Sequence, residues 1–228
     1  MIKDLDYTIK QLLSQNLPTN LPIEKNSIDI NFDMPDQDWV AKLQKLPTIN
    51  LFLYDIRENR ELRNNERLRA RTGTTALEIR SPVYMDFSYM LTVWASDIND
   101  EHQVLGAVLK TLLRYPILPM EVLQGELQTE LNHTPLPDRI PLPGMQPIPL
   151  RAWVSQPERI PNSWEFWTVL EGRLKAGISY VVTVPVQPFT PDKVYLATEN
   201  TIKFNYKDSS SDTDANQTTN SHIATGRQ

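Results

Sequence analysis

The alternation of apolar and polar residues is clearest from residue 82 to residue 95, where it predicts one long strand. Because successive side chains of a strand point to opposite faces, the pattern predicts one face against a core and a wetter face behind it. The apolar face carries Val83, Met85, Phe87, Tyr89, Leu91, Val93 and Ala95, and the wetter face carries Asp86, Ser88 and Thr92.

A helix is predicted directly after this strand, up to Tyr115. Polar residues 97–100 begin it and place acidic side chains where the helix dipole favours them, and Pro116 ends it. One side is apolar at helical spacing: Val104, Leu105, Val108, Leu109, Leu112 and Leu113. The apolar side of such a helix has to be buried against another element, and we expect it to pack on the apolar face of the preceding strand.

Weaker patterns predict the remaining elements. A helix is expected at residues 3–17, and strands are expected at 26–32, 48–56, 122–127, 150–154, 177–186 and 194–204. Segment 48–56 is apolar on both faces, which is typical of a central strand. Trp39 is interpreted as a packing anchor in a polar connector. Recurring prolines from Pro135 to Pro149 predict an extended strap, and Trp164, Phe166 and Trp167 predict a short helix in a core or subunit contact.

Composition limits the choice of function. The chain has 228 residues and a formal net charge of −5, which argues against general affinity for nucleic acid. It has no cysteine, so disulfides, cysteine zinc sites and cysteine catalysis are excluded. The absence of cysteine fits a reducing cytoplasm, where we expect the protein. The sequence shows no apolar leader and no apolar stretch long enough to span a membrane. From residue 207 polar residues dominate, which predicts a domain at 1–206 and a disordered tail at 207–228.

No catalytic constellation is found in the sequence. The three histidines, His102, His133 and His222, have no metal-ligand spacing, and no G-x-S-x-G or G-x-G-x-x-G motif is present. His102 follows Glu101, but the first turn of a helix is a routine place for both residues. We therefore predict no catalytic, metal or cofactor site, and a binding or assembly role rather than an enzyme.

An arginine-rich segment is the candidate functional feature. Residues 57–80 hold seven arginines against four glutamates in a chain that is acidic as a whole. The segment follows a predicted strand without a break and contains Gly73, so it predicts two extended arms joined at a mobile tip. A solvated hairpin is one interpretation. The other is a contact arm for an acidic partner, because arginine pairs bidentately with carboxylates and phosphates. The candidate interface residues are Arg57, Arg60, Arg63, Arg67, Arg69 and Arg71.

Three stretches together carry a family resemblance. They are residues 49–59 (INLFLYDIREN), residues 86–106 with YMLTVWA, and residues 163–167 (SWEFW). In this order and spacing they resemble the cap, or tail-terminator, proteins of contractile injection systems of the antifeeding-prophage type. The likeness covers roughly residues 1–190 and leaves the tail outside.

The resemblance implies a mixed α/β (α+β) subunit related to phage tail terminators, with a largely antiparallel sheet, a few helices and a long protruding hairpin. It implies a homohexameric ring at the baseplate-distal end of the particle, which ends polymerisation of the inner tube and clamps the last sheath ring. Residues 51–60 and the helix 164–170 are then structural. The implied partners are further copies of the chain, the inner-tube protein and the sheath protein, with no cofactor, nucleic acid or membrane insertion.

Two other classes of function stay open on the sequence. One is a baseplate or tube-adaptor subunit of the same particle, which differs from a cap in its position. The other is a nucleic-acid-binding protein that uses the arginine-rich segment, which would bind in a strongly salt-dependent way.

Overall fold

A five-stranded sheet organises the body of the molecule. The computed structural model describes residues 1–18, 28–72, 74–132, 149–155, 167–168, 175–195, 200–203 and 223–226. The strand order is β1 (Asp29–Asn31), β2 (Thr48–Glu58), β5 (Val83–Trp94), β7 (Gly177–Val186) and β6 (Arg151–Val154). Only β1 and β2 pair in parallel, so the sheet is largely antiparallel as predicted. The long predicted strand is β5, and it lies at the centre.

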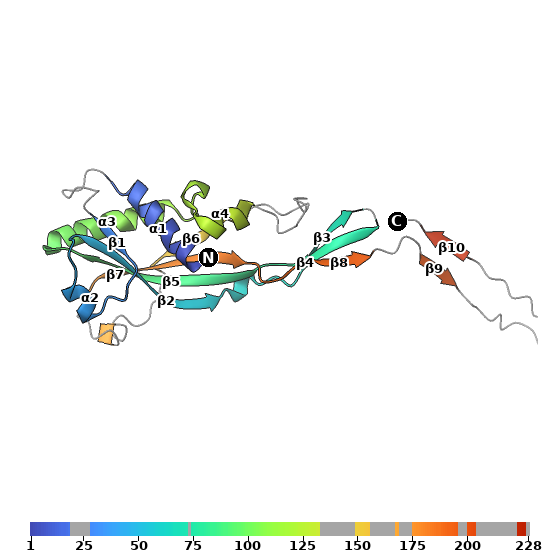
Figure 1. Ribbon diagram of the computed structural model, residues 1–228, viewed down its shortest axis with the longest axis horizontal. Coiled ribbons are helices and arrows are strands. Elements are labelled where there is room, and N and C mark those ends of the chain that lie inside the picture. The colour runs from blue at the N-terminus through green and yellow to red at the C-terminus, as the bar shows by residue number, and fades with distance from the viewer. Residues whose placement is uncertain are drawn as a thin grey trace, which may run out of the picture.

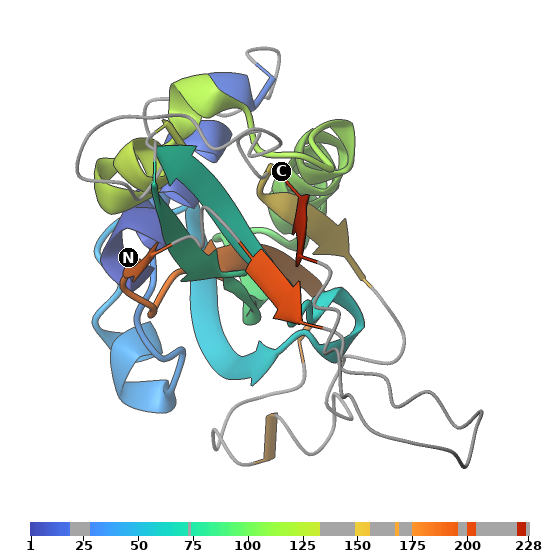
Figure 2. The same ribbon diagram turned by 90° about the vertical axis from the view of Figure 1, so that its right-hand side faces the viewer.

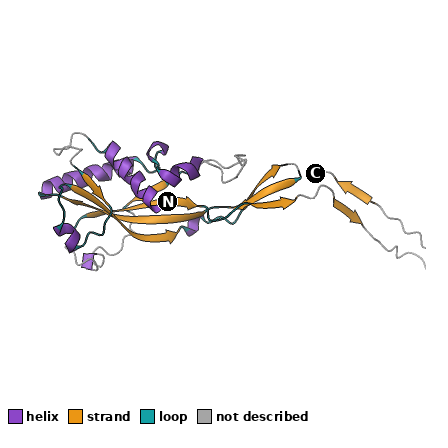
Figure 3. Ribbon diagram, viewed as in Figure 1, coloured by secondary structure: helices purple, strands orange, loops and turns teal. Residues whose placement is uncertain are grey.

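Three helices cover one face of this sheet: α1 (Ile2–Asn16), α3 (Ile98–Arg114) and α4 (Gly125–Asn132) (Figures 1 and 3). The prediction that the helix after β5 packs on its odd-numbered face is confirmed, although Leu113 is exposed. The core joins Phe87, Tyr89, Leu91 and Val93 of β5 to Val104, Val108 and Leu112 of α3 and to Leu5, Ile9, Leu12 and Leu13 of α1. No helix in the described part of the chain is long and apolar enough to cross a membrane.

The opposite face of the sheet differs from the prediction. Asp86, Ser88 and Thr92, expected to be wetter, are all buried. At one end of this face, Trp39 of the short helix α2 (Gln37–Ala41) packs edge-on against Trp94, with ring centroids 5.9 Å apart and planes at 74°. Trp39 is thus a packing anchor, as predicted. The buried part of this second face mixes polar residues with Met90 and Val181, so the polarity of the side chains alone did not predict whether they are exposed.

A second, smaller sheet projects beyond the body. It consists of β3 (Arg67–Thr72), β4 (Thr75–Arg80) and β8 (Asp192–Tyr195), in the order β3-β4-β8. Figure 1 shows these strands beyond the end of the main sheet, and Figure 2, which looks along the long axis, shows them in front of the body. The predicted protruding hairpin is confirmed, and β8 adds a third strand to it. We call residues 57–80 together with 192–195 the arm.

Some shorter predictions are wrong or fall outside the described residues. The strand predicted at 122–127 is wrong, because the chain forms the 3₁₀ helix η3 (Met120–Val122) and then α4. The proline strap lies almost entirely outside the described residues, and only residues 167 and 168 of the aromatic helix are described, as helix. Within the tail predicted to be disordered, β10 (Ile223–Gly226) pairs antiparallel with β9 (Asn200–Lys203). The division at residue 206 stays a prediction.

Candidate functional site

Asn59 holds the junction between the body and the strands of the arm, which we call the neck (residues 57–66, 80–86 and 187–189). Its backbone N–H donates to the carbonyl oxygen of Tyr84 (2.8 Å), and its side-chain Nδ2 donates to both carboxylate oxygens of Asp86 (3.2 and 3.1 Å). Its Oδ1 accepts the N–H of Leu62 (3.2 Å), which caps the 3₁₀ helix η2 (Arg60–Leu62). The buried Asp86 also accepts a hydrogen bond from the hydroxyl of Thr183 (2.6 Å). This network fixes the point at which the chain leaves β2.

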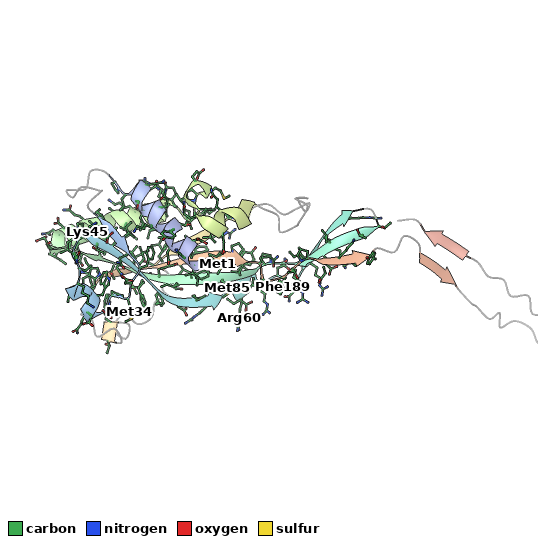
Figure 4. The ribbon with its side chains drawn as sticks, viewed as in Figure 1. Met1, Met34, Lys45, Arg60, Met85 and Phe189 are labelled. Carbon is green, nitrogen blue, oxygen red and sulfur yellow. The ribbon has the colours of Figure 1, made fainter. Side chains whose placement is uncertain are left out.

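Ser81 closes the arm on the other side of the neck. Its N–H and its hydroxyl both donate to the carbonyl oxygen of Glu66, at 3.1 and 3.0 Å. The side chain of Gln187 donates to the carbonyl oxygen of Arg80 (2.9 Å), and the Arg80 guanidinium lies 5.3 Å from the ring centre of Phe189. Figure 4 places Phe189 at this neck, with Arg60 nearby at the end of the body. The arm is therefore fastened to the body by directed polar contacts.

The strand register separates the arm into two faces. Arg67 pairs with Arg80, Arg69 with Glu78 and Arg71 with Ala76, so these side chains share one face. The other face carries Leu77, Ile79 and Tyr195, and Tyr195 is 78% exposed. The arginines of β3 are thus gathered on one side of a thin sheet.

Glu78 lies at the centre of the charged face. Its side chain is only 6% exposed and accepts from Nη1 of Arg67 (2.6 Å) and Nε of Arg69 (2.7 Å). The hydrogen bonds from Arg67 and then Arg69 hold the pKa of the Glu78 carboxyl below its ordinary value. Two guanidinium groups on one carboxylate leave a net positive charge on this face.

The structure brings three of the six predicted arginines together on β3 and leaves the other three at the neck. Arg57 forms an ion pair with Asp55 (2.6 Å), and Arg63 forms one with Glu58 (3.5 Å). Arg60 is exposed and forms no ion pair with a described residue. The segment 57–80 keeps an excess of three positive charges despite its internal pairing. Its role as a partner interface stays a prediction.

Two further candidates for a site are a metal-binding cluster and the pairing of Glu101 with His102. Among the described residues, no group of three histidine, aspartate or glutamate side chains could hold a metal ion. Glu101, which invites an acid–base pairing with His102, is instead buried in an ion pair with Lys175, whose ammonium lies 4.5 Å from the ring centre of Trp94.

Comparison with known proteins gives one family and two similar structures. The family model described as the Pvc16 N-terminal domain matches residues 4–194. A solved structure described as the PVC sheath/tube terminator of an extracellular contractile injection system, in the extended state, is 22% identical, with a TM-score of 0.58 over 96% of this chain. Another, described as the anti-feeding prophage tube-terminating cap, is 20% identical, with a TM-score of 0.55 over 94% of this chain.

Both structures are longer than this chain. The chain spans 65% of the first and 62% of the second, which is less than two thirds of each. No relative is found among curated proteins. The two likenesses show a terminator-like α+β fold and confirm the predicted resemblance to the caps of antifeeding-prophage-type systems.

Proposed function

We propose, from the premise that the chain belongs to the family of Pvc16 N-terminal domains, that it is a structural cap of a contractile injection particle. The match over residues 4–194 is the observation that carries the proposal. The terminator-like fold supports it, since both similar structures are described as terminators of a tube or of a sheath and tube.

In this proposal the chain forms a homohexameric ring at the baseplate-distal end, where it ends the inner tube and contacts the last sheath ring. A cyclic ring uses heterologous contacts, so each subunit presents two different patches to its neighbours. A terminator must match the end of the tube on one side and offer no copy of the docking surface on the other, which is specificity by omission. The particle would assemble in the cytoplasm, and no chemical step is required.

The arm is the proposed contact with an acidic tube or sheath surface, through Arg57, Arg60, Arg63, Arg67, Arg69 and Arg71. Its position beyond the body supports this role, because a protruding segment reaches a neighbouring protein (Figure 1). Charge reversal of Arg60, Arg63 and Arg67 should weaken capping, since like charges placed opposite one another repel.

Imaging particles assembled with the chain deleted tests the function. We expect overlong or frayed tubes, restored to normal length by the wild-type chain and less completely by the charge-reversed variant. A variant with Lys42 and Lys45 reversed to glutamate is the control, because Lys45 lies at the opposite end of the body from Arg60 (Figure 4). Normal tubes after deletion, or a tagged chain located at the baseplate, would refute a terminator.

A further inference from the structure

We propose that the outer edge of β3 is a docking site for an extended strand of another protein, one that carries carboxylates at alternate positions. The proposal rests on the proposed function in one respect: it expects the incoming strand to belong to a neighbouring protein of the particle. It specifies how the arm binds: by adding a fourth strand to the sheet β3-β4-β8, rather than by charge alone.

One hydrogen bond shows which backbone N–H and C=O groups of β3 point toward the outer edge of the sheet. Residues directly opposite each other in an antiparallel pair alternate between hydrogen-bonded and non-hydrogen-bonded pairs. Ser81 lies opposite Glu66 in the register and donates its N–H to the carbonyl oxygen of Glu66, so these two residues are a hydrogen-bonded pair. The backbone N–H and C=O groups of Glu66 and of every second residue after it therefore point toward β4. The N–H and C=O groups of Arg67 and Arg69 therefore point away from β4, toward the outer edge.

This edge is longer and more open than those of the main sheet. β3 has six residues, and no described strand pairs with its outer side. Both edge strands of the main sheet use backbone groups in contacts with other segments. In the three-residue β1, the carbonyl oxygen of Ile30 accepts a hydrogen bond from the Lys10 ammonium (3.1 Å). In β6, the N–H of Ala152 donates to the carbonyl oxygen of Pro116 (2.8 Å). A covering segment is a usual protection of a sheet edge, so β3 differs from β1 and β6 in leaving the outward backbone groups of Arg67 and Arg69 without a described partner strand.

The side chains of β3 select the chemistry of the incoming strand. Arg67 uses Nη1 and Arg69 uses Nε to reach Glu78, and a guanidinium has five N–H donors, so each keeps donors for a further carboxylate. Alternate positions of a strand share a face, so a matching strand has aspartate or glutamate at the alternate positions that lie opposite the arginines.

A second copy of β3 does not fit, because pairing the edge with itself sets arginine opposite arginine, and like charges directly opposite each other destabilise a strand pair. A nucleic acid does not fit either, because it offers no ladder of alternating N–H and C=O groups to the backbone of β3. The occupant is thus a polypeptide strand with alternating acidic residues.

Binding of a capped peptide of alternating glutamate and valine to the full chain tests the proposal. Amide NMR signals of Arg67 and Arg69 should shift on titration, and a peptide with lysine in place of glutamate should bind at least about tenfold more weakly. The decisive pair of variants is Arg69→Pro and Arg69→Ala. Both lose the ion pair with Glu78, but only proline removes the outward N–H, which the arm itself does not use.

Arg69→Pro should weaken binding of the glutamate peptide about tenfold relative to Arg69→Ala, as one lost hydrogen bond implies. Unchanged amide signals of the β2, β5 and β7 residues would show that the body stays folded. Equal affinity of the two variants, equal binding of both peptides, or no shift at Arg67 and Arg69 in the wild type would overturn the proposal. Self-association that only Arg69→Pro abolishes would assign the edge to a second copy and overturn it as well.

These outcomes are separate from the test of capping. Normal tubes after deletion of the chain would refute the cap while leaving the peptide result standing. Overlong tubes together with no peptide binding would refute only the strand docking.

Discussion

Replacing Thr183 by valine should lower the free energy of unfolding, because it removes a hydroxyl donor from the buried carboxylate of Asp86. The Thr183 hydroxyl lies 2.6 Å from Asp86 Oδ1, and each residue is 3% exposed. Water cannot readily replace the lost donor at that depth. A hydrogen bond to a charged group contributes about 1.5–3 kcal/mol, so we expect a loss of about 2 kcal/mol.

Ser179→Ala is the matched control. Ser179 lies on the same strand and the same face as Thr183 and is 2% exposed, but its hydroxyl oxygen forms no hydrogen bond with a described residue. Removing it takes away no bonded partner, so we expect a change within about 0.5 kcal/mol. The two substitutions thus differ in the hydrogen bond rather than in burial or position.

Urea unfolding followed by circular dichroism measures both variants. With a slope of about 2 kcal/mol per molar, the Thr183→Val midpoint should fall by about 1 M urea and the Ser179→Ala midpoint by less than about 0.3 M. A double-mutant cycle of Thr183→Val with Asp86→Asn should show a coupling of at least about 0.5 kcal/mol. Equal midpoints for the two single variants, or no coupling, would refute the reasoning that the Asp86 network stabilises the neck.

Three further predictions concern other parts of the chain. Gly106→Ala should raise the melting temperature, because an added Cβ meets nothing within 4 Å on the helix, whereas Gly125→Ala should lower it, because φ is +54° and the Cβ would lie 2.4 Å from a carboxylate oxygen of α1. Burial raises the pKa of Asp6, so the wild type loses stability as the pH rises through that pKa and Asp6 becomes charged. Asp6→Asn carries no such charge, so its melting temperature relative to the wild type should rise with pH, and a constant difference would contradict this. The lowered pKa of Glu78 means that its ion pairs stabilise the arm above the unfolded pKa of about 4.3, so Glu78→Gln should speed amide exchange in β3 and β4 at neutral pH and match the wild type at acid pH.

Local periodicity predicted the elements whose burial depends on their own pattern. Strand β7 was predicted with the bounds observed, and β5 with α3 within a few residues, because each has a long apolar stripe. The burial of Ser88 and Thr92 could not be predicted in this way, because it depends on what packs on that face. The single strand expected at 194–204 is instead two, β8 (Asp192–Tyr195) and β9 (Asn200–Lys203). The pairing of β8 could not be predicted locally, because its four residues are mostly exposed and its partner β4 lies more than a hundred positions earlier in the chain.

The candidate site was predicted in position but not in its internal pairing. The arginine content of residues 57–80 identified the arm, yet it could not show that Glu78 holds Arg67 and Arg69. A signal for this pairing does exist in the sequence. Pairing Thr72 with Thr75 sets Arg69 opposite Glu78, so fixing the register of the hairpin first would have predicted it.

The thinness of the arm gives its proposed docking a thermodynamic consequence. The main sheet is covered by helices, whereas the described part of the arm is a single layer in which Ala76 and Ile79 are the buried apolar residues. Such a sheet is marginal by itself and opens more readily than a packed core. A fourth strand bound at β3 would supply new hydrogen bonds and stabilise the arm by mass action, so the arm would be most ordered when it is docked. Capping and ordering of the arm would then be one coupled equilibrium, which favours the assembled filament over a free subunit.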